Sequence, residues 1–542
     1  METIYHSGRI LTMVDQDDAP EAVLVRDGLI AAIGSVEEVR AEASPQAEAV
    51  DLDGRTLMPS FIDSHGHILQ HGMLASLVDL EHARSIAEVV SAFRDRLAQR
   101  AAEDRTPLVG AKYDPQLLAE GRHPTREDLD QVTTELPVFA LHRSMHVAVG
   151  NTFLVDGAGL TARTPDPEGG RFGRFADGTP DGYVEEHPAM AAFLPVLSPD
   201  GGGGLLPAGV ANPLRAAELA AADYLRHGIT TAQEGAADPA TISGLVEAAG
   251  TGALGLDVVV YPVVQSGTAA FDEHPEFAGE YRGRLRLGGY KMILDGSPQA
   301  RSAWMSEPYA PIEGDEEPGC AYPIHAPQEV EDFTRAVAEQ EKQLIVHCNG
   351  DAAAELWVST AERVGAEHPA LLEKRPVMIH AQTVRDDQLE RMAPLGMIAS
   401  IFTCHTWFWG DVHLRNFGPE RGRRVSPARS ALDRGVRVTL HQDTPVTPPD
   451  MLLTIWAAVN RVSRTGQPVG LEQRISTWEA LRAVTCEAAY QYGEEDSKGQ
   501  IREGMRADLV ILSSDPLATA PQDLRETEVL ETIKDGAVVF RA

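Results

Sequence analysis

Short apolar segments alternate with longer amphipathic ones through the middle of the chain. Nine of the short segments have the length and composition of buried strands: 60–67, 137–145, 228–235, 257–264, 289–296, 343–350, 376–382, 396–402 and 436–443. Between them lie segments with helical periodicity, such as 214–227, and the helix start signals Ser85–Glu88 and Ser476–Glu479. This alternation is typical of parallel β/α units. We therefore predict a (β/α)₈ barrel, which accommodates only eight of the nine strands.

Both ends of the chain have a different pattern, with short strands and tight turns instead of long helices. Asp27-Gly28 and Asp535-Gly536 each stand between two apolar runs, which is the signal of a β-hairpin. We predict one small β-sandwich domain formed by residues 1–57 and 495–542, with the metal-dependent barrel at 58–494. The Gly- and Pro-rich segment near 157–207 is too long for an ordinary connection, so we expect an inserted, lid-like segment there.

Composition narrows the possible partners. The 542 residues suit a large barrel with one accessory domain, and no apolar run reaches the roughly 18 residues of a membrane span. The start METIYHSGRI has no export signal, so we expect a soluble, cytoplasmic protein without a membrane partner. The 47 basic and 81 acidic residues give a net charge of −34, which disfavours nucleic acid. We expect a small-molecule substrate and allow for a homodimer.

Candidate metal ligands stand where predicted strands end. Histidines two positions apart at the end of the first strand share a face and can bind one ion. Other ligand types follow on four later strands, and the strands of a barrel all end at one face. Each residue alone is more often structural, and the histidine pair arises easily by chance, but their joint placement indicates a metal centre. The residues are His65, His67, Lys291, His347, His380 and Asp443.

The order of these motifs resembles that of the amidohydrolase superfamily and, within it, amidohydrolase family 3. The resemblance covers essentially the whole chain and rests on these segments: FIDSHGH (61–67), HRSMHVAVGN (142–151), GITTAQEG (228–235), KMILDGSPQARSA (291–303), VHCNGDAA (346–353), MIHAQ (378–382), HQDTPV (441–446) and GQIREGMRADLVIL (499–512). It implies that His65 and His67 bind the more buried of two metal ions. It further implies that His347 and His380 bind the second ion.

The same resemblance assigns roles to two further residues. Lys291 matches a lysine that reacts with CO₂ to form a carbamate bridging both ions, and Asp443 matches an aspartate that binds metal and shuttles a proton. We expect divalent metal, with zinc as the first choice, but superfamily members use one ion or two, and the sequence leaves both open. Gln442 replaces a common serine and can alter the surroundings of Asp443, while Asp295 either supports Lys291 or ends its strand.

Five residues are candidates for contact with substrate. His146 and Asn151 match a family segment that faces substrate, and His146 would help to stabilise an oxyanion, although a histidine in an apolar strand can equally be a core residue. Three aromatic residues follow strand ends and could line an apolar pocket, with helix packing as the open alternative. They are Trp304, Trp407 and Trp409.

Together these features predict hydrolysis of a C–N bond, of amide or N-formyl type, in a small and partly apolar substrate. A water molecule activated by the metal would attack the carbonyl carbon, and Asp443 would pass its proton to the departing amine. A carbon–oxygen hydrolase or a deaminase on the same scaffold is the alternative, because fold and metal site do not select the bond. A catalytically silent binding or regulatory relative is a second alternative, which the retention of all six ligand residues disfavours.

Overall fold

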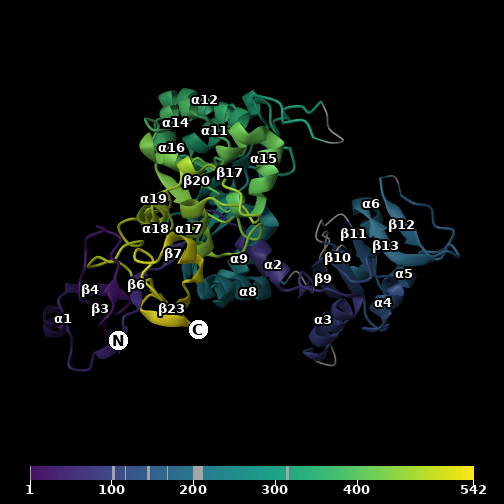
Figure 1. Cartoon of the computed structure of the whole chain (residues 1–542), viewed down its shortest axis with the longest axis horizontal. Coiled ribbons are helices and arrows are strands. Elements are labelled where there is room, and N and C mark those ends of the chain that lie inside the picture. The colour runs from purple at the N-terminus through teal and green to yellow at the C-terminus, as the bar shows by residue number, and fades with distance from the viewer. Residues whose placement is uncertain are drawn as a thin grey trace. The chain divides into compact units, whose positions relative to one another are not determined.

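The computed structural model describes residues 2–100, 104–115, 117–142, 147–167, 169–198, 212–312 and 317–542. The chain forms two compact units (Figure 1). Unit 1 comprises Met1–Ile68 and Ala221–Ala542, and unit 2 comprises Leu69–Ala220. Within the described ranges, no helix combines the length and apolar composition that crossing a membrane requires.

Two sheets of parallel strands form the core of unit 1. The first sheet has the order β16-β15-β14-β7, with β7 (Phe61–Ile62), β14 (Ile229–Ala237), β15 (Asp257–Pro262) and β16 (Leu285–Leu287). The second has the order β17-β18-β19-β20-β21, with β17 (Gly289–Ile293), β18 (Gln343–Cys348), β19 (Val377–His380), β20 (Ile398–Ile401) and β21 (Val438–Leu440). Nearly every residue of these strands is buried, as expected for parallel strands covered on both faces.

Main-chain contacts join the two sheets at both edges. Only Gly288 separates β16 from β17, and its N–H donates to the carbonyl of Val260 on β15 (2.9 Å). At the other edge, the N–H of Asp443 donates to the carbonyl of His65 (3.2 Å), and the N–H of His67 donates to the carbonyl of Thr444 (2.7 Å). The carboxyl ends of β7 and β21 are therefore neighbours.

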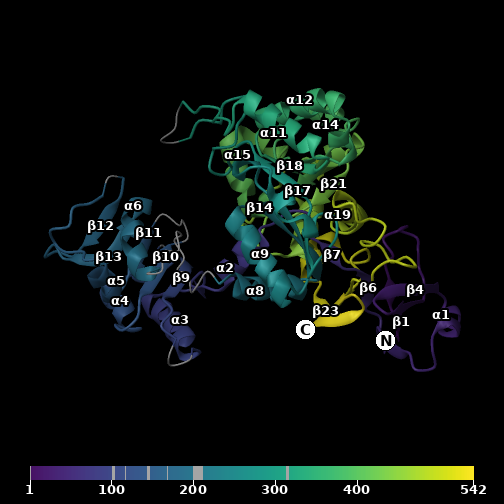
Figure 2. The ribbon, with the colours of Figure 1, turned by 180° about the vertical axis from the view of Figure 1, so that it is seen from behind.

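Helices alternate with the strands along the chain: α8 (Pro213–Arg226), α9 (Pro239–Thr251), α11 (Pro327–Glu339), α12 (Asp351–Glu367), α14 (Asp386–Met392), α15 (His405–Arg423), α16 (Ala428–Asp433), α17 (Met451–Asn460), α18 (Thr477–Ala483) and α19 (Cys486–Gln491). Of these, α9, α11, α12, α16, α18 and α19 contact strands of the two parallel sheets. Figure 2 shows α9 beside β14, which it contacts. The predicted capping box of α18 is confirmed, because Ser476 and Glu479 exchange both hydrogen bonds. At Ser85 only half of the box forms, since Glu88 accepts the N–H of Arg84 instead.

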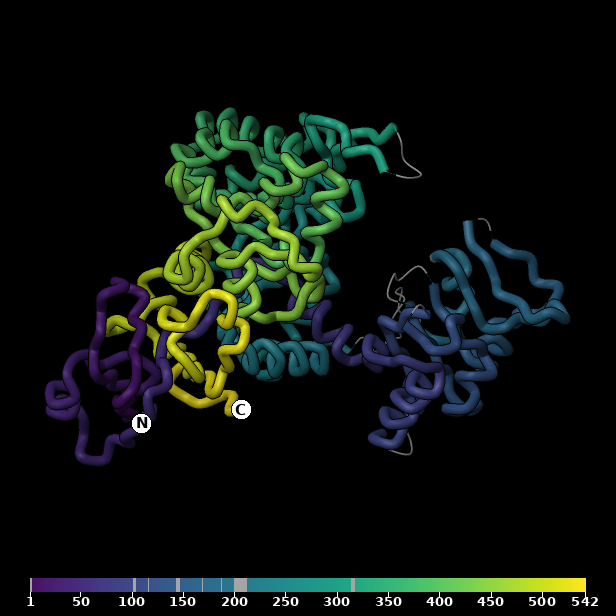
Figure 3. Tube along the Cα trace, in the orientation of Figure 1, coloured from purple at the N-terminus to yellow at the C-terminus, as the bar shows by residue number. Residues whose placement is uncertain are grey.

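The two chain ends build two further sheets of unit 1 (Figure 3). One contains β1 (Glu2–His6), β3 (Ala22–Arg26), β4 (Leu29–Gly34) and β5 (Glu48–Asp51); the other contains β2 (Arg9–Ile10), β6 (Thr56–Pro59), β22 (Leu509–Leu512), β23 (Val529–Lys534) and β24 (Ala537–Arg541). Strand β6 from the start of the chain pairs with β22 from its end. Both predicted Asp-Gly turns are confirmed, with positive φ at both residues of each. Side chains from the two sheets share one apolar core, including Tyr5, Leu509 and Ile533.

Eight of the nine predicted strands lie in the parallel sheets of unit 1, and 137–145 is the one that lies elsewhere. Its described part, β10 (Val138–His142), belongs to unit 2, in a sheet of order β12-β13-β11-β10-β9-β8. There β10 pairs antiparallel with β11 (Val147–Gly150) and parallel with β9 (Leu108–Tyr113). An apolar run buried in either sheet has the same composition, so the sequence alone did not distinguish them.

The segment near 157–207 contributes to the packed structure of unit 2. Its described part forms β12 (Arg171–Arg174), β13 (Pro180–Glu185) and the short helices α6 (Glu186–Met190) and α7 (Leu194–Leu197). Phe172, Val184 and Phe193 from this segment are buried in one apolar cluster. Residues 199–207 of the predicted lid, with the glycine run, lie outside the described residues.

Candidate metal centre

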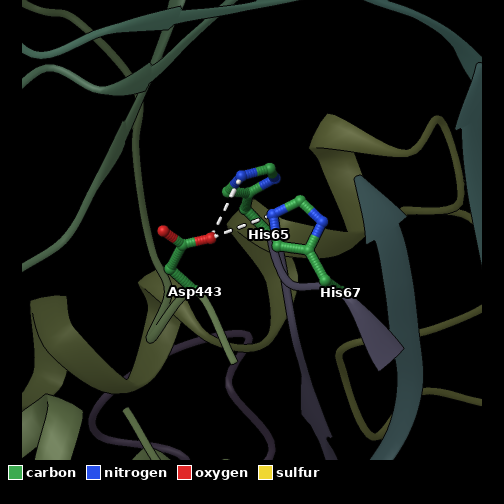
Figure 4. Close-up of side chains that lie close together, drawn as sticks. All are labelled: His65, His67 and Asp443. Carbon is green, nitrogen blue, oxygen red and sulfur yellow. Dashed lines mark ion pairs between the residues drawn. The ribbon is translucent and has the colours of Figure 1, made fainter. Parts of the chain in front are cut away.

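His65 and His67 follow β7 and face the carboxylate of Asp443, which follows β21. Nε2 of His65 lies 3.4 Å from Asp443 Oδ1, and Nε2 of His67 lies 3.3 Å from the same oxygen. Figure 4 shows both rings directed at this oxygen. One ligand atom from each of the three residues lies within 4.8 Å of the others, so the three can hold one ion.

The other three predicted ligands lie around this group. Lys291 on β17 places Nζ 3.3 Å from His65 Nε2. His380, the last residue of β19, places Nε2 4.0 Å from the second oxygen of Asp443, and the ring of His347 on β18 lies 4.5 Å from the ring of His380. The structure thus brings together all six residues from five strands, and we call them the candidate metal centre, or the centre.

The chemistry of these residues fits a divalent cation. Asp443 directs Oδ1 at His65 and His67 and Oδ2 at His380, so its carboxylate spans two groups of histidines. Oδ1 is buried and has no hydrogen-bond partner among the described residues. A buried carboxylate oxygen surrounded by imidazole nitrogens is the donor set that zinc and similar ions prefer.

His380 and Asp443 both have left-handed backbone conformations, with φ of 72° and 53°. For residues other than glycine this conformation costs about 1 kcal/mol or more and is concentrated at functional sites. Here it lies at two of the six centre residues, so the chain adopts a strained conformation where it presents these side chains.

Two buried residues of β14 orient the first two histidines. Gln233 donates its amide N–H groups to the carbonyl of Ser64 and the hydroxyl of Tyr492 (both 3.0 Å), so its Oε1 must accept from His65 Nδ1 (2.6 Å). His65 therefore carries its proton on Nδ1 and directs the Nε2 lone pair at the centre. On His67 the equivalent partner of Nδ1 is Glu234 Oε1, at 3.4 Å.

Asp295 orients the ring of His347. The sequence had suggested that Asp295 either supports Lys291 or ends its strand. Its buried carboxylate lies 3.1 Å from His347 Nδ1 and accepts the main-chain N–H groups of Trp304, Asn349 and Gly350. The amide of Asn349 lies 3.2 Å from the other ring nitrogen of His347. A cation bound by His347 would have to replace that contact.

Burial and mutual contact shift the protonation of the centre. Burial lowers the pKa of Lys291 to about 7, so much of this amine is neutral near neutral pH. Burial also lowers the pKa of His65 and of His380 well below the usual value. For Asp443, burial would raise the pKa, but the surrounding His67, His380 and His65 hold it well below its ordinary value. His67 differs, because Asp443 and Glu234 outweigh the effect of burial and raise its pKa to about 9. Neutral imidazoles and an ionised carboxylate are the states that bind metal, so His67 would release a proton when an ion binds.

The predicted substrate contacts have different outcomes. His146 lies outside the described residues. Asn151 is fully buried in unit 2, where its amide caps α5 (Thr152–Gly157) and bonds to the main chain of Val138, Thr133 and Leu136; the fold alone accounts for this side chain.

The three tryptophans predicted to contact substrate lie in three different surroundings. Trp304 lines a cavity of about 560 Å³ that none of the six centre residues lines. Trp407 packs against Trp456 and lies under Arg525, which explains it as a helix-packing residue. Trp409 is linked to the centre through one ring: it lies 6.3 Å from Phe402, which in turn lies 6.2 Å from the ring of His380.

Sequence reasoning gave no role to Gln233, Glu234, Ser400 or Tyr492. The available signal was the polar pair Gln233-Glu234 inside the otherwise apolar β14, because a buried polar side chain needs a partner.

Comparison with known proteins confirms the resemblance that the motifs indicate. The putative amidohydrolase YtcJ of Bacillus subtilis (strain 168) is 27% identical over 100% of this chain and 99% of its own length. N-substituted formamide deformylase of Arthrobacter pascens is 28% identical over 98% and 97% of the two chains. The solved structure of an uncharacterized metal-dependent hydrolase from Pyrococcus furiosus has a TM-score of 0.75 and 26% identity, covering 95% of this chain and 100% of that one. Since a family model described as the amidohydrolase family matches residues 48–540, the chain belongs to the amidohydrolase family.

Proposed function

We propose that this protein is a metal-dependent hydrolase that cleaves the C–N bond of an amide or N-formyl group in a small, partly apolar substrate. The observation that carries the proposal is the convergence of six potential ligands from five strands, with Asp443 between the two groups of histidines. The C–N bond is the inference from family membership and from the name of the Arthrobacter relative.

We also propose that the parallel strands of unit 1, with β16 and β17 counted as one, close into a (β/α)₈ barrel and that the two sheets of the chain ends form a β-sandwich. The near-continuous segment β16–β17 and the main-chain bonds from His67 and Asp443 support closure. In such a barrel the active site lies at the carboxyl face, where the metal centre stands.

The residues present suit one or two zinc ions. His65, His67 and Asp443 would hold the first, while His347 and His380 would hold a second, and Lys291 would contribute a ligand as a carbamate formed with CO₂. Zinc supplies Lewis acidity, which makes water a nucleophile near neutral pH and polarises a carbonyl group.

The chain's own residues would complete the reaction. The ionised carboxylate of Asp443 would accept a proton from the attacking water and return it to the departing amine. Trp409, with its ring 4.7 Å from His405, would form part of an apolar wall that excludes water from the substrate. His146 remains the candidate for stabilising the oxyanion.

Metal content and a substrate panel test the proposal together. Purified protein is analysed for zinc before and after chelation, then assayed with N-formyl amines, acyl amides, lactams and esters. We expect at least one bound zinc per chain and hydrolysis of a C–N substrate that chelation abolishes and zinc restores. Protein that binds no metal would contradict the metal centre. Zinc-dependent cleavage of esters alone would contradict the C–N assignment and leave the metal centre intact.

A further inference from the structure

We propose that Ser64, Ser400 and His441 are positioning residues that determine which ring nitrogen of His380 carries a proton. The inference deepens the proposed function, because it concerns the delivery of a lone pair from His380 to the metal centre. None of the three touches a reacting atom in the proposed reaction, so each would act through His380.

The four side chains form one buried chain of hydrogen bonds that links four strand ends. Ser64 Oγ lies 3.0 Å from the carbonyl oxygen of Leu440 and 3.2 Å from Ser400 Oγ. Ser400 Oγ lies 2.9 Å from His441 Nδ1, and His441 Nε2 lies 3.1 Å from His380 Nδ1. Relative exposure is 0% for Ser64, Ser400 and His441 and 4% for His380, so water is largely excluded from these contacts.

The carbonyl of Leu440 fixes the direction of every bond in the chain. A carbonyl oxygen only accepts, so the hydroxyl of Ser64 donates to it and must accept from Ser400. Ser400 has then used its single proton, and it accepts from His441 Nδ1. A neutral His441 therefore has its lone pair on Nε2.

The protonation of His441 in turn determines that of His380. Because His441 Nε2 accepts, His380 Nδ1 is the donor, and the lone pair of His380 lies on Nε2. This is the nitrogen that lies 4.0 Å from Asp443 Oδ2. Partners that fix the tautomer of a ligand histidine commonly contribute a factor of about 10 to 100 to metal affinity.

Removing the hydroxyl of Ser400 should reverse the direction of the hydrogen bond between His441 and His380. In Ser400→Ala, His441 Nδ1–H would have no acceptor, so His441 would place its proton on Nε2 and donate to His380 Nδ1. The proton of His380 would then lie on Nε2 and block the centre. Ser400→Thr keeps a hydroxyl at this position and should restore the original direction.

The test uses the full chain with ¹⁵N-labelled histidine, first stripped of metal and then titrated with zinc against a competing chelator. Ring ¹⁵N shifts report which nitrogen is protonated, and His380→Gln identifies the signals of His380. We expect Nδ1–H on His380 and His441 in the wild type and in Ser400→Thr. In Ser400→Ala we expect Nε2–H on His380 and zinc affinity about 10- to 100-fold weaker.

A buried serine elsewhere provides the control. Ser430 accepts a hydrogen bond from Gln473, and Ser430→Ala should change neither the ring shifts nor the zinc affinity. Nε2–H on His380 in the metal-free wild type overturns the inference, even if Ser400→Ala fails to fold. So does a Ser400→Ala protein that retains Nδ1–H on His380. Failure of the wild type to bind zinc would contradict the proposed function. It would leave the inference about His380 testable, because the ring shifts are measured on metal-free protein.

Discussion

Asp443 Oδ1 lies 3.3 Å from Nε2 of His67, although the two residues follow the last and the first of the parallel strands of unit 1 in chain order. Main-chain bonds at the same strand ends hold the two segments together, because the N–H of Asp443 donates to the carbonyl of His65. The main chain of Asp443 is therefore held beside the segment that carries His65 and His67.

Asp443→Asn should remove the proton acceptor and leave most of the metal ligands in place. We expect turnover to fall about 10²- to 10⁴-fold, as for other losses of a general base, while much of the zinc remains bound. Asp17→Asn, at an exposed aspartate, is the matched control and should keep full activity. Steady-state kinetics with metal analysis checks this, and undiminished turnover in Asp443→Asn would remove the residue from the mechanism.

Gln233→Leu should weaken metal binding through its effect on His65, although residue 233 is not itself a proposed ligand. Without Oε1 of Gln233, His65 is free to place its proton on the nitrogen that faces the centre, so zinc affinity should fall about 10- to 100-fold. Gln343→Leu is the control, since Gln343 is a buried residue that also makes three hydrogen bonds, with Tyr261, Arg375 and Gln491. Both variants should lose stability, but only Gln233→Leu should lose zinc affinity in a chelator competition. Equal zinc affinity in the two would show that Gln233 has only a structural role.

Five of the six centre residues could be predicted from the sequence because each is a polar side chain at the end of an apolar run, whereas Lys291 lies inside the run of β17 and its role comes from the family resemblance. That signal is local: it needs only the run and the knowledge that parallel strands end at one face. Ser400 gives no comparable signal, since a serine inside GMIASIF is unremarkable until Ser64 and His441 are brought beside it. Positioning residues are therefore the part of the site that pattern analysis misses.

The limits of the fold prediction have a similar cause. The run at 137–145 has the composition of a barrel strand, but its sheet is decided by partners such as β11, which pairs antiparallel with β10. Likewise, the Gly- and Pro-rich composition of 157–207 gave no indication that Phe172 and Phe193 from this segment are buried in one apolar cluster of unit 2. Hydrophobicity predicts that a segment is buried and does not say against which neighbour.

Lys534→Met should destabilise the protein strongly. Lys534 is fully buried and lies 2.6 Å from Asp508 and 2.7 Å from Asp257, so its loss leaves two buried carboxylates short of a partner. Breaking such a pair typically costs about 3–5 kcal/mol of unfolding free energy. Arg541→Met is the control, because Arg541 pairs with Glu531 at the surface, where a salt bridge contributes about 0–1 kcal/mol. Urea unfolding of both variants measures the difference, and similar midpoints would contradict the prediction.

Asp257 should make stability fall in acid. Burial would raise its pKa, but Lys498 and Lys534 hold the pKa of Asp257 well below its ordinary value. The unfolded chain takes up this proton first, near its ordinary pKa of about 3.9, so the stabilisation is present above that pH and is lost as the pH falls below it.

Asp257→Asn checks the sign of this effect. The variant lacks the carboxylate, so it should be much less stable than the wild type at about pH 6, and the gap should narrow at about pH 3.5. Unfolding midpoints at the two pH values measure the gap, with Asp17→Asn expected to follow the wild type throughout. A gap that stays constant would show that Asp257 titrates alike in the folded and unfolded chain.

Trp409 and Trp407 provide a paired test of the substrate pocket, because they lie two positions apart at the start of α15 and contact different neighbours. Trp409 packs against His405 and Phe402 beside the centre, whereas Trp407 packs against Trp456. For an apolar substrate we expect Trp409→Ala to raise KM about tenfold, the loss of one apolar wall, with a smaller effect on kcat. Trp407→Ala should lower the thermal midpoint and leave KM unchanged. Steady-state kinetics of both variants measures these effects, and an unchanged KM in Trp409→Ala would show that Trp409 packs against its neighbouring rings without contacting the substrate.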